Sequence, residues 1–112
     1  MRRAKAKGRR GSWFAVVDGE HLPCVHQHWF TGLEYDDPYY DRTKDHWLTF
    51  VAGIYSAGRV IMTEDHLTEV GAERLPAFRR KRYIAVYEVT DVRTEDTHLR
   101  FKRNGQRLIE LD

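Results

Sequence analysis

The sequence YIAVYEV at residues 83–89 is the clearest strand signal in this chain. It is apolar on both faces except at Glu88, as is typical of a strand with neighbours on both sides. Residues 59–63 (RVIMT) form a second strand-like run. We therefore expect residues 83–89 to be a central strand of a sheet.

Two further strands are expected near the N-terminus. Residues 13–17 (WFAVV) end at Asp18-Gly19, which has the residue types of a tight turn. Residues 21–30 are rich in aromatic and β-branched side chains, and Pro23 lies near their start, where a backbone donor can be spared. We expect these two runs to pair with each other.

The C-terminal part predicts a hairpin, because Asn104-Gly105 separates strand-like residues 97–103 from residues 106–111. In that hairpin Phe101 would face Leu108. Residues 46–55 fit both a helix and a strand, and Gly53 and Gly58 favour the strand with a turn after it. One or two helical turns are expected in residues 64–70, with Gly71 at their end, and residues 31–45 are expected to be a long loop.

Together these signals predict a mainly β protein of about seven strands with a short helical insert. A small curved β-barrel suits such a chain, because it leaves few strand edges exposed. The length of 112 residues allows one domain, expected at residues 11–112. Residues 1–10 hold six basic residues and no acid, and we expect them to be a mobile, disordered tail.

The charge is divided unevenly between the tail and the rest. The chain has 19 basic and 17 acidic residues, so residues 11–112 hold 13 basic against 17 acidic, a net charge of −4. The single cysteine excludes an internal disulfide and fits a reducing compartment. No apolar run reaches the roughly 18 residues that span a bilayer. We expect a cytoplasmic protein without a membrane partner.

The sequences GIYSAGRVIMTED (residues 53–65) and LPAFRRKRYIAVYEVTDV (residues 75–92) resemble the second half of PUA-like domains of the EVE and ASCH types. The resemblance covers about residues 46–92. It implies a curved β-barrel that binds nucleic acid, often at a modified base, in a cleft lined by aromatic and polar side chains. Some ASCH members look like ribonucleases or amidohydrolases, so the resemblance leaves open whether the protein is an enzyme.

Two groups of residues are candidates for binding DNA or RNA. The basic run Arg79, Arg80, Lys81 and Arg82 can contact phosphates, or can be a solvated segment paired with nearby acids. Aromatic rings can stack on a splayed or flipped base, or can be part of the core. The aromatic candidates are Trp29, Tyr39, Tyr40 and Trp47, of which we expect Tyr39 and Tyr40 at the surface. This interpretation requires no cofactor.

The alternative is a metal-dependent enzyme or a metal-binding β-barrel. Cys24, His26 and His28 alternate, so on one strand they would share a face, and thiolate and imidazole are ligands of zinc and other divalent transition metals. The same pattern also fits the polar face of a half-exposed strand. An acidic group could supply further ligands or acid–base chemistry, or could simply form turns; it comprises Glu34, Asp36, Asp37, Asp41, Asp45 and the neighbouring His46. A third interpretation is a protein-interaction module without a site of its own.

Overall fold

The computed structural model describes residues 2–8, 13–67 and 79–112. This part of the chain holds ten strands, one α-helix and one short 3₁₀-helix. In chain order the elements are β1 (Arg2–Ala4), β2 (Lys7–Gly8), β3 (Phe14–Val17), β4 (Glu20–His26), η1 (Gln27–Trp29), β5 (Phe30–Thr31), β6 (Glu34–Asp37), α1 (Asp45–Ala57), β7 (Arg59–Leu67), β8 (Arg79–Glu95), β9 (His98–Arg103) and β10 (Ile109–Leu111). The described helices include none long and apolar enough to cross a membrane.

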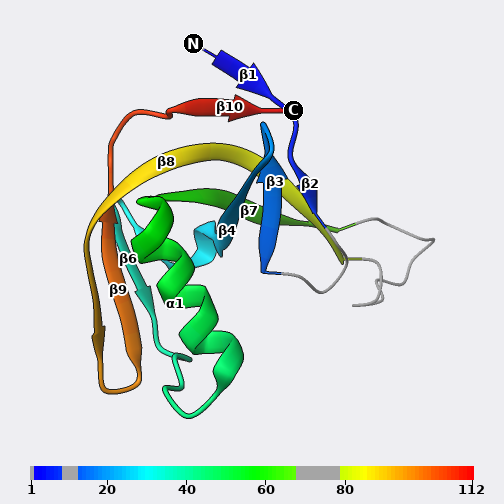
Figure 1. Ribbon diagram of the computed structural model, residues 1–112. Coiled ribbons are helices and arrows are strands. Elements are labelled where there is room, and N and C mark those ends of the chain that lie inside the picture. The colour runs from blue at the N-terminus through cyan, green and yellow to red at the C-terminus, as the bar shows by residue number, and fades with distance from the viewer. Residues whose placement is uncertain (1, 9–12, 68–78) are drawn as a thin grey trace.

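The strands form one curled sheet in the order β2-β3-β4-β7-β8-β9-β6-β5. β4 and β7 are parallel, and the other neighbours along this path are antiparallel. Figure 1 shows the sheet curving as a half-barrel around α1, which lies between the β9–β6 side and the β3–β4 side. The prediction of a mainly β, small curved barrel with a short helical insert is confirmed.

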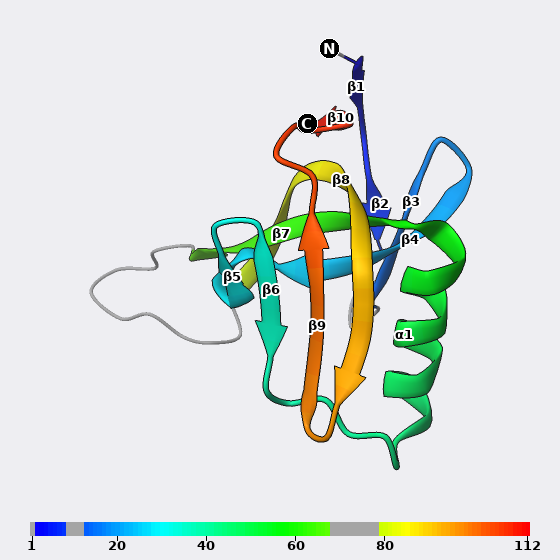
Figure 2. The same ribbon diagram turned by 90° about the vertical axis from the view of Figure 1, so that its left-hand side faces the viewer.

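β8 is the long central strand that joins the two sides. Its first half pairs with β7 on one edge and with β10 on the other, and its second half pairs with β9. The pairing with β9 shifts register between Thr90 and Arg93, and Asp91 between them has a positive φ of 55°. Such irregularities bend a strand, and Figures 1 and 2 show β8 turning from one wall into the other. The prediction of a central strand at residues 83–89 is confirmed.

The N-terminal hairpin is also confirmed. Val17 pairs with Glu20 across a two-residue turn, in which Asp18 and Gly19 have φ values of 51° and 78°. The second strand is shorter than expected, because β4 ends at His26 and the chain continues through η1.

The strand expected at residues 46–55 is wrong, because this segment is helix α1. Trp47, Phe50 and Ile54 lie on one helix face and are buried against the sheet. Gly53 is inside the helix, where a Cβ would come within 2.7 Å of the Phe14 ring, so its role is close packing. Gly58 ends the helix with a φ of 63°, and its N–H donates to the Ile54 carbonyl at 2.9 Å.

The hairpin expected at Asn104-Gly105 is wrong as well. β9 already has β8 on one edge and β6 on the other, so neither edge is left for the C-terminal residues. β10 pairs instead with β8 and β1. The two-residue turn lies at residues 96–97, between Glu95 and His98, and Phe101 faces Tyr35 rather than Leu108.

Two segments differ from the expected loop and helical turns. Residues 34–37, placed in the expected loop, form strand β6 because Tyr35 pairs with Phe101 and packs inward. Residues 64–67, expected to start a helical turn, continue strand β7 by pairing with β8. The rest of that expected turn, with Gly71, lies outside the described residues.

Within residues 2–8, which were expected to be a mobile tail, residues 2–4 and 7–8 form strands. β1 pairs in parallel with β10, and β2 pairs with β3. The Asp112 N–H donates to the Ala4 carbonyl at 3.0 Å, and Arg3 forms an ion pair with the Asp112 side chain. These backbone and charge contacts hold the segment against the sheet. Residues 9–12 lie outside the described part.

Two clusters of buried side chains hold the fold together. The larger lies inside the curl, where Phe50 and Ile54 of α1 meet Leu99 and Phe101 of β9. The smaller includes Leu22, Ile61 and Val86 from the central strands, with Ile109 and Leu111 of β10. Burial of apolar area at about 25 cal/mol per Å² is the main favourable term for such a fold.

Candidate nucleic-acid interface

A hollow of about 180 Å³, which we call the aromatic hollow, lies between several elements of the fold. It is bordered by residues from β4, η1, β6, α1 and β7, together with Trp13 just before β3. The lining residues are Trp13, Cys24, His26, Trp29, Tyr35, Asp37, Tyr39, Trp47, Phe50 and Thr63.

The rings around the hollow form two groups. Trp13 contacts Trp47 and Phe50 edge-on, with ring centroids 4.8 Å and 5.0 Å apart. Trp29 contacts Tyr39 in the same manner at 5.4 Å. Tyr39 is 70% exposed, whereas Trp47 is 7% exposed, so the hollow extends from a solvent-exposed rim at Tyr39 to a buried floor at Trp47.

Strand β6 supplies the polar group of the hollow. Its side chains alternate between the faces of the sheet, so Tyr35 and Asp37 are buried while Glu34 and Asp36 are exposed. The Asp37 carboxylate accepts hydrogen bonds from the Tyr35 hydroxyl at 3.1 Å and from the Tyr39 N–H at 2.9 Å. Burial raises the pKa of Asp37, although these two hydrogen bonds act in the opposite direction. Burial, with Asp37 beside it, also raises the pKa of Tyr35 well above its ordinary value.

Three of the four aromatic residues predicted from the sequence line this hollow. They are Trp29, Tyr39 and Trp47, which come from η1, from the turn after β6 and from α1. The prediction that Tyr40 lies at the surface is wrong, because it is 8% exposed and packs its ring against Trp47 at 5.7 Å. Tyr39 and Tyr40 are consecutive residues, yet Tyr39 lies at the exposed rim of the hollow and Tyr40 is buried.

The basic run lies at the start of β8, opposite the end of β7. Arg82 is exposed and forms an ion pair with Glu64 at 3.2 Å, and Glu64 also accepts a hydrogen bond from the Gln27 side chain at 2.9 Å. Gln27 begins η1, the same turn that carries Trp29. The side chains of Arg79, Arg80 and Lys81 lie outside the described part, although their backbone is in β8.

Arg82 also borders a second, polar hollow of about 260 Å³, which contains Gln27, Glu64, Arg107 and Glu110 in its lining. Arg107 forms an ion pair with Glu110 and donates to the Tyr87 hydroxyl at 3.2 Å. The two hollows share no lining residue, but Gln27 and Trp29 place them at either end of the same short turn.

The expected arrangement of Cys24, His26 and His28 on one strand face is wrong. β4 ends at His26, and the chain turns into η1 when the His28 N–H donates to His26 Nδ1 at 2.9 Å. Cys24 and His26 line the aromatic hollow, whereas exposed His28 packs edge-on against Trp29 at 4.8 Å. Within residues 2–8, 13–67 and 79–112, no group of three or more His, Cys, Asp or Glu residues is placed to hold a metal ion.

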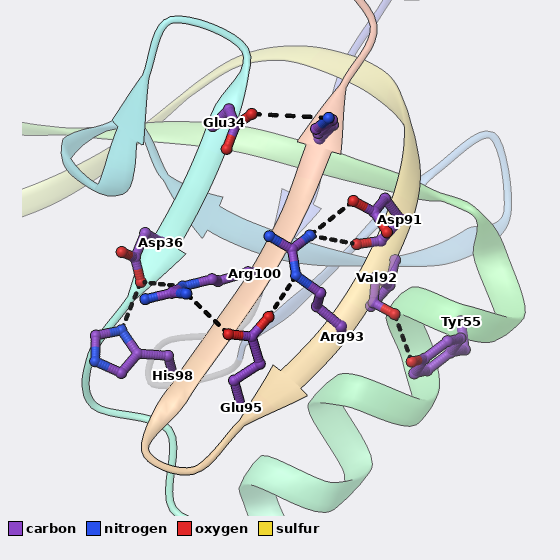
Figure 3. Close-up of polar contacts among 10 residues, drawn as sticks. Glu34, Asp36, Tyr55, Asp91, Val92, Arg93, Glu95, His98 and Arg100 are labelled. Carbon is purple, nitrogen blue, oxygen red and sulfur yellow. Dashed lines mark hydrogen bonds and ion pairs between the residues drawn. The ribbon is translucent and has the colours of Figure 1, made fainter.

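The remaining predicted acids lie on the outer face of the sheet, in the turn before α1 or, for Asp45 and the neighbouring His46, at the start of α1. Asp36 binds His98 Nδ1 at 2.7 Å and lies 3.4 Å from Arg100 Nε, and Figure 3 shows Glu95 linking Arg100 to Arg93. The hydrogen bond from His98 is the main cause that lowers the pKa of Asp36. Asp41 accepts from the Thr43 N–H and hydroxyl and so stabilises the turn before α1. Of the acidic group, Asp37 alone is among the residues that line the aromatic hollow.

The sequence did not single out Trp13, Phe50 and Thr63 as site residues. Trp13 reaches the hollow because its carbonyl accepts from the Cys24 N–H at 2.8 Å, which holds it beside β4. Phe50 and Thr63 reach it through α1 and β7. The helical spacing of Trp47 and Phe50 was the one available signal that the two rings share a face.

No protein-family model, curated protein or solved structure matches this chain.

Proposed function

We propose that this protein binds single-stranded nucleic acid and holds one base in the aromatic hollow. The observation that carries the proposal is the convergence of Trp29, Tyr39 and Trp47 on one hollow that also contains the Asp37 carboxylate. Stacking of a base on an aromatic side chain is worth roughly 1–3 kcal/mol and is open to every base. A carboxylate can accept hydrogen bonds from the amino groups on base edges.

The basic start of β8 supports a path for the phosphates. Arg82 is connected through Glu64 and Gln27 to η1, the turn that presents Trp29 to the hollow. Arg79, Arg80 and Lys81 precede it in the same strand. A base in the hollow and phosphates along this strand are therefore compatible with one continuous ligand. Because residues 11–112 carry a net charge of −4, attraction of a polyanion must come from such a local cluster.

The resemblance to PUA-like domains of the EVE and ASCH types supports the same proposal and adds a modified base as the ligand. The single cysteine supports a cytoplasmic location, where thiols stay reduced.

The test measures binding of labelled single- and double-stranded DNA and RNA to the full chain by fluorescence anisotropy. The full chain is used because β1 and β2 belong to the sheet. We expect single strands to bind best, with an affinity that falls as salt rises. Failure of every polymer to bind at low salt would overturn the proposal.

Two exposed tyrosines provide matched variants. Tyr39→Ala removes a rim ring that is 70% exposed, and should weaken single-strand binding roughly 5- to 150-fold, the equivalent of about 1–3 kcal/mol. Tyr55→Ala removes a tyrosine that is 60% exposed on α1, away from the hollow, and should change binding less than about twofold. Equal losses in the two variants would contradict a base-binding role for the hollow. Arg82→Gln should reduce the salt dependence by about one counterion.

A further inference from the structure

We propose that the base held in the aromatic hollow carries a positive charge, as a base methylated on a ring nitrogen does. This inference rests on the proposed function and names the ligand class of the same site. Its basis is the combination of many aromatic walls with one buried carboxylate, that of Asp37, which forms no ion pair among the described residues.

The walls favour a cation over a neutral ring. Six of the ten lining residues are Trp, Tyr or Phe, and none of the ten is Lys or Arg. The faces of aromatic rings are electronegative, so a cation above them gains roughly 0.5–1 kcal/mol when exposed and about 2 or more when desolvated. A flat cationic base gains this attraction in addition to stacking.

The carboxylate gives the second argument. Asp37 is 7% exposed, and its two hydrogen-bond donors, the Tyr35 hydroxyl and the Tyr39 N–H, are both neutral. No ion pair of Asp37 is found in the part of the chain that the structure describes. A buried carboxylate is costly unless it is paired with a cation. A cationic ligand would supply that missing charge.

The neighbouring residue shows what a paired aspartate looks like in this protein. Asp36, one position earlier in β6, lies between His98 and Arg100. The chain thus pairs the exposed carboxylate with cations, whereas the two hydrogen-bond donors of the buried one, at the hollow, are neutral. This is the distribution expected if the counter-ion of Asp37 arrives with the ligand.

A base suits this site better than a methylated lysine, because the hollow adjoins η1 and hence the basic start of β8, where a nucleotide would place its phosphates. A methylated lysine brings no phosphate of its own to that basic run, whereas every nucleotide of a strand does. The methylated peptide is therefore treated as a competing outcome of the experiment.

The test compares two isomeric nucleosides, 1-methyladenosine and N6-methyladenosine, at neutral pH. They are isomers as neutral molecules, but at neutral pH 1-methyladenosine holds one additional proton and is a cation, whereas N6-methyladenosine stays neutral. All three tryptophans of the chain line the hollow, so quenching of tryptophan fluorescence reports binding at this site. We expect 1-methyladenosine to bind at least about tenfold more tightly, a difference of about 1.4 kcal/mol.

The variants identify the source of the preference. Asp37→Asn should reduce it to less than about threefold, while Asp36→Asn, the matched change on the outer face, should leave it intact. Tyr39→Leu keeps an apolar side chain at the exposed rim and should weaken the cation more than the neutral isomer; it serves as a second test if Asp37→Asn does not fold. Equal affinities of the wild-type protein for the two isomers, or a preference that survives in Asp37→Asn, would overturn the inference.

The remaining outcomes separate this inference from the proposed function. If single strands bind but the isomers bind equally, the charged-base inference is wrong and nucleic-acid binding stands. If 1-methyladenosine is preferred but no polymer binds, the cation site stands and nucleic-acid binding is wrong. If a peptide with trimethyllysine binds tenfold more tightly than 1-methyladenosine, the ligand is a protein and the inference is overturned.

Discussion

Asp36 and Asp37 are neighbours in β6, yet their carboxyls lie on opposite faces of the sheet. The pKa values of the two carboxyls are shifted in opposite directions from the ordinary value. Asp36 is exposed, and the hydrogen bond from His98 lowers its pKa. Asp37 is buried, and that burial raises its pKa. The residue type and the strand are the same, so the difference comes from the face alone.

The two faces are built on different physical terms. On the outer face, charges of β6, β8 and β9 neutralise each other across the strands, as Figure 3 shows for Asp36, Arg100, Glu95 and Arg93. Exposed pairs of this kind contribute little to stability. On the inner face, packed rings surround one carboxylate. The outer-face charges are therefore paired with one another, whereas the Asp37 carboxylate on the inner face forms no ion pair among the described residues.

The largest expected effect is on the free energy of unfolding, when a buried side chain of β9 is truncated on the inner face of the sheet. Phe101 is 1% exposed and stacks on Tyr35 with ring centroids 4.4 Å apart, so Phe101→Ala should lower the free energy of unfolding by about 3–5 kcal/mol. Lys102→Ala, on the next residue and the outer face, should change it by less than about 0.5 kcal/mol. Urea denaturation measures both. Equal costs would mean that the faces do not differ as described.

A smaller effect on the free energy of unfolding is expected when each aspartate loses one of the side chains that donate a hydrogen bond to it. Tyr35→Phe takes a hydroxyl from buried Asp37 and should cost about 1–3 kcal/mol, because a buried acceptor is left without that donor. His98→Ala takes a ring nitrogen from exposed Asp36 and should cost less than about 1 kcal/mol. Chemical denaturation at neutral pH provides the comparison. A His98 cost as large as that of Tyr35 would contradict it.

The outer network should also be sensitive to salt. Arg100 lies between Asp36 and Glu95, and Arg100→Met should lower stability by less than about 1 kcal/mol at low salt. At about 1 M salt, where the Debye length is about 3 Å, this cost should fall close to zero. The cost of Phe101→Ala should persist at both salt concentrations. A salt-independent Arg100 effect would assign its role to packing of the side-chain stem.

The smallest effect concerns the two titrations themselves. The carboxyl resonances of Asp37 and Asp36 should give midpoints above and below the ordinary value of 3.8, respectively. For Asp36, whose pKa is lowered by folding, the contribution to stability is present above the unfolded pKa and is lost as pH falls through the folded value. For Asp37 the sign is reversed, so protonation at low pH favours the folded state. A lower midpoint for Asp37 than for Asp36 would refute the assignment.

Strands with strong local patterns could be predicted from the sequence, and elements set by distant contacts could not. The apolar run at residues 83–89 predicted a central strand, and the residue types Asp18-Gly19 predicted a tight turn, without reference to any distant residue. The glycine at position 53 was misleading, because its role depends on Phe14, which is far away in sequence. Asn104-Gly105 was misleading because the edges of β9 are filled by β6 and β8, which no local pattern of β9 reveals.

The candidate site was predictable in its aromatic part. Trp29, Tyr39 and Trp47 were candidates either for stacking on a base or for the core, and they line one hollow, whereas their binding of a base stays a prediction. Asp37 was expected only as one of several acids, since the alternation of β6 that buries it was hidden within an expected loop. Tyr40 was predicted to lie at the surface but is buried. The direction of a side chain after a turn depends on tertiary packing, here against Trp47, which the local sequence does not reveal.

The pairing of β1 with β10 determines when β1 can join the sheet during synthesis of the chain. Arg2 pairs with Ile109, so a strand at one end of the printed sequence is completed by a strand at the other. Synthesis runs from the N-terminus, and contacts of such large sequence separation carry the largest loop-closure cost. β1 must therefore wait until β10 has been made before the two can pair.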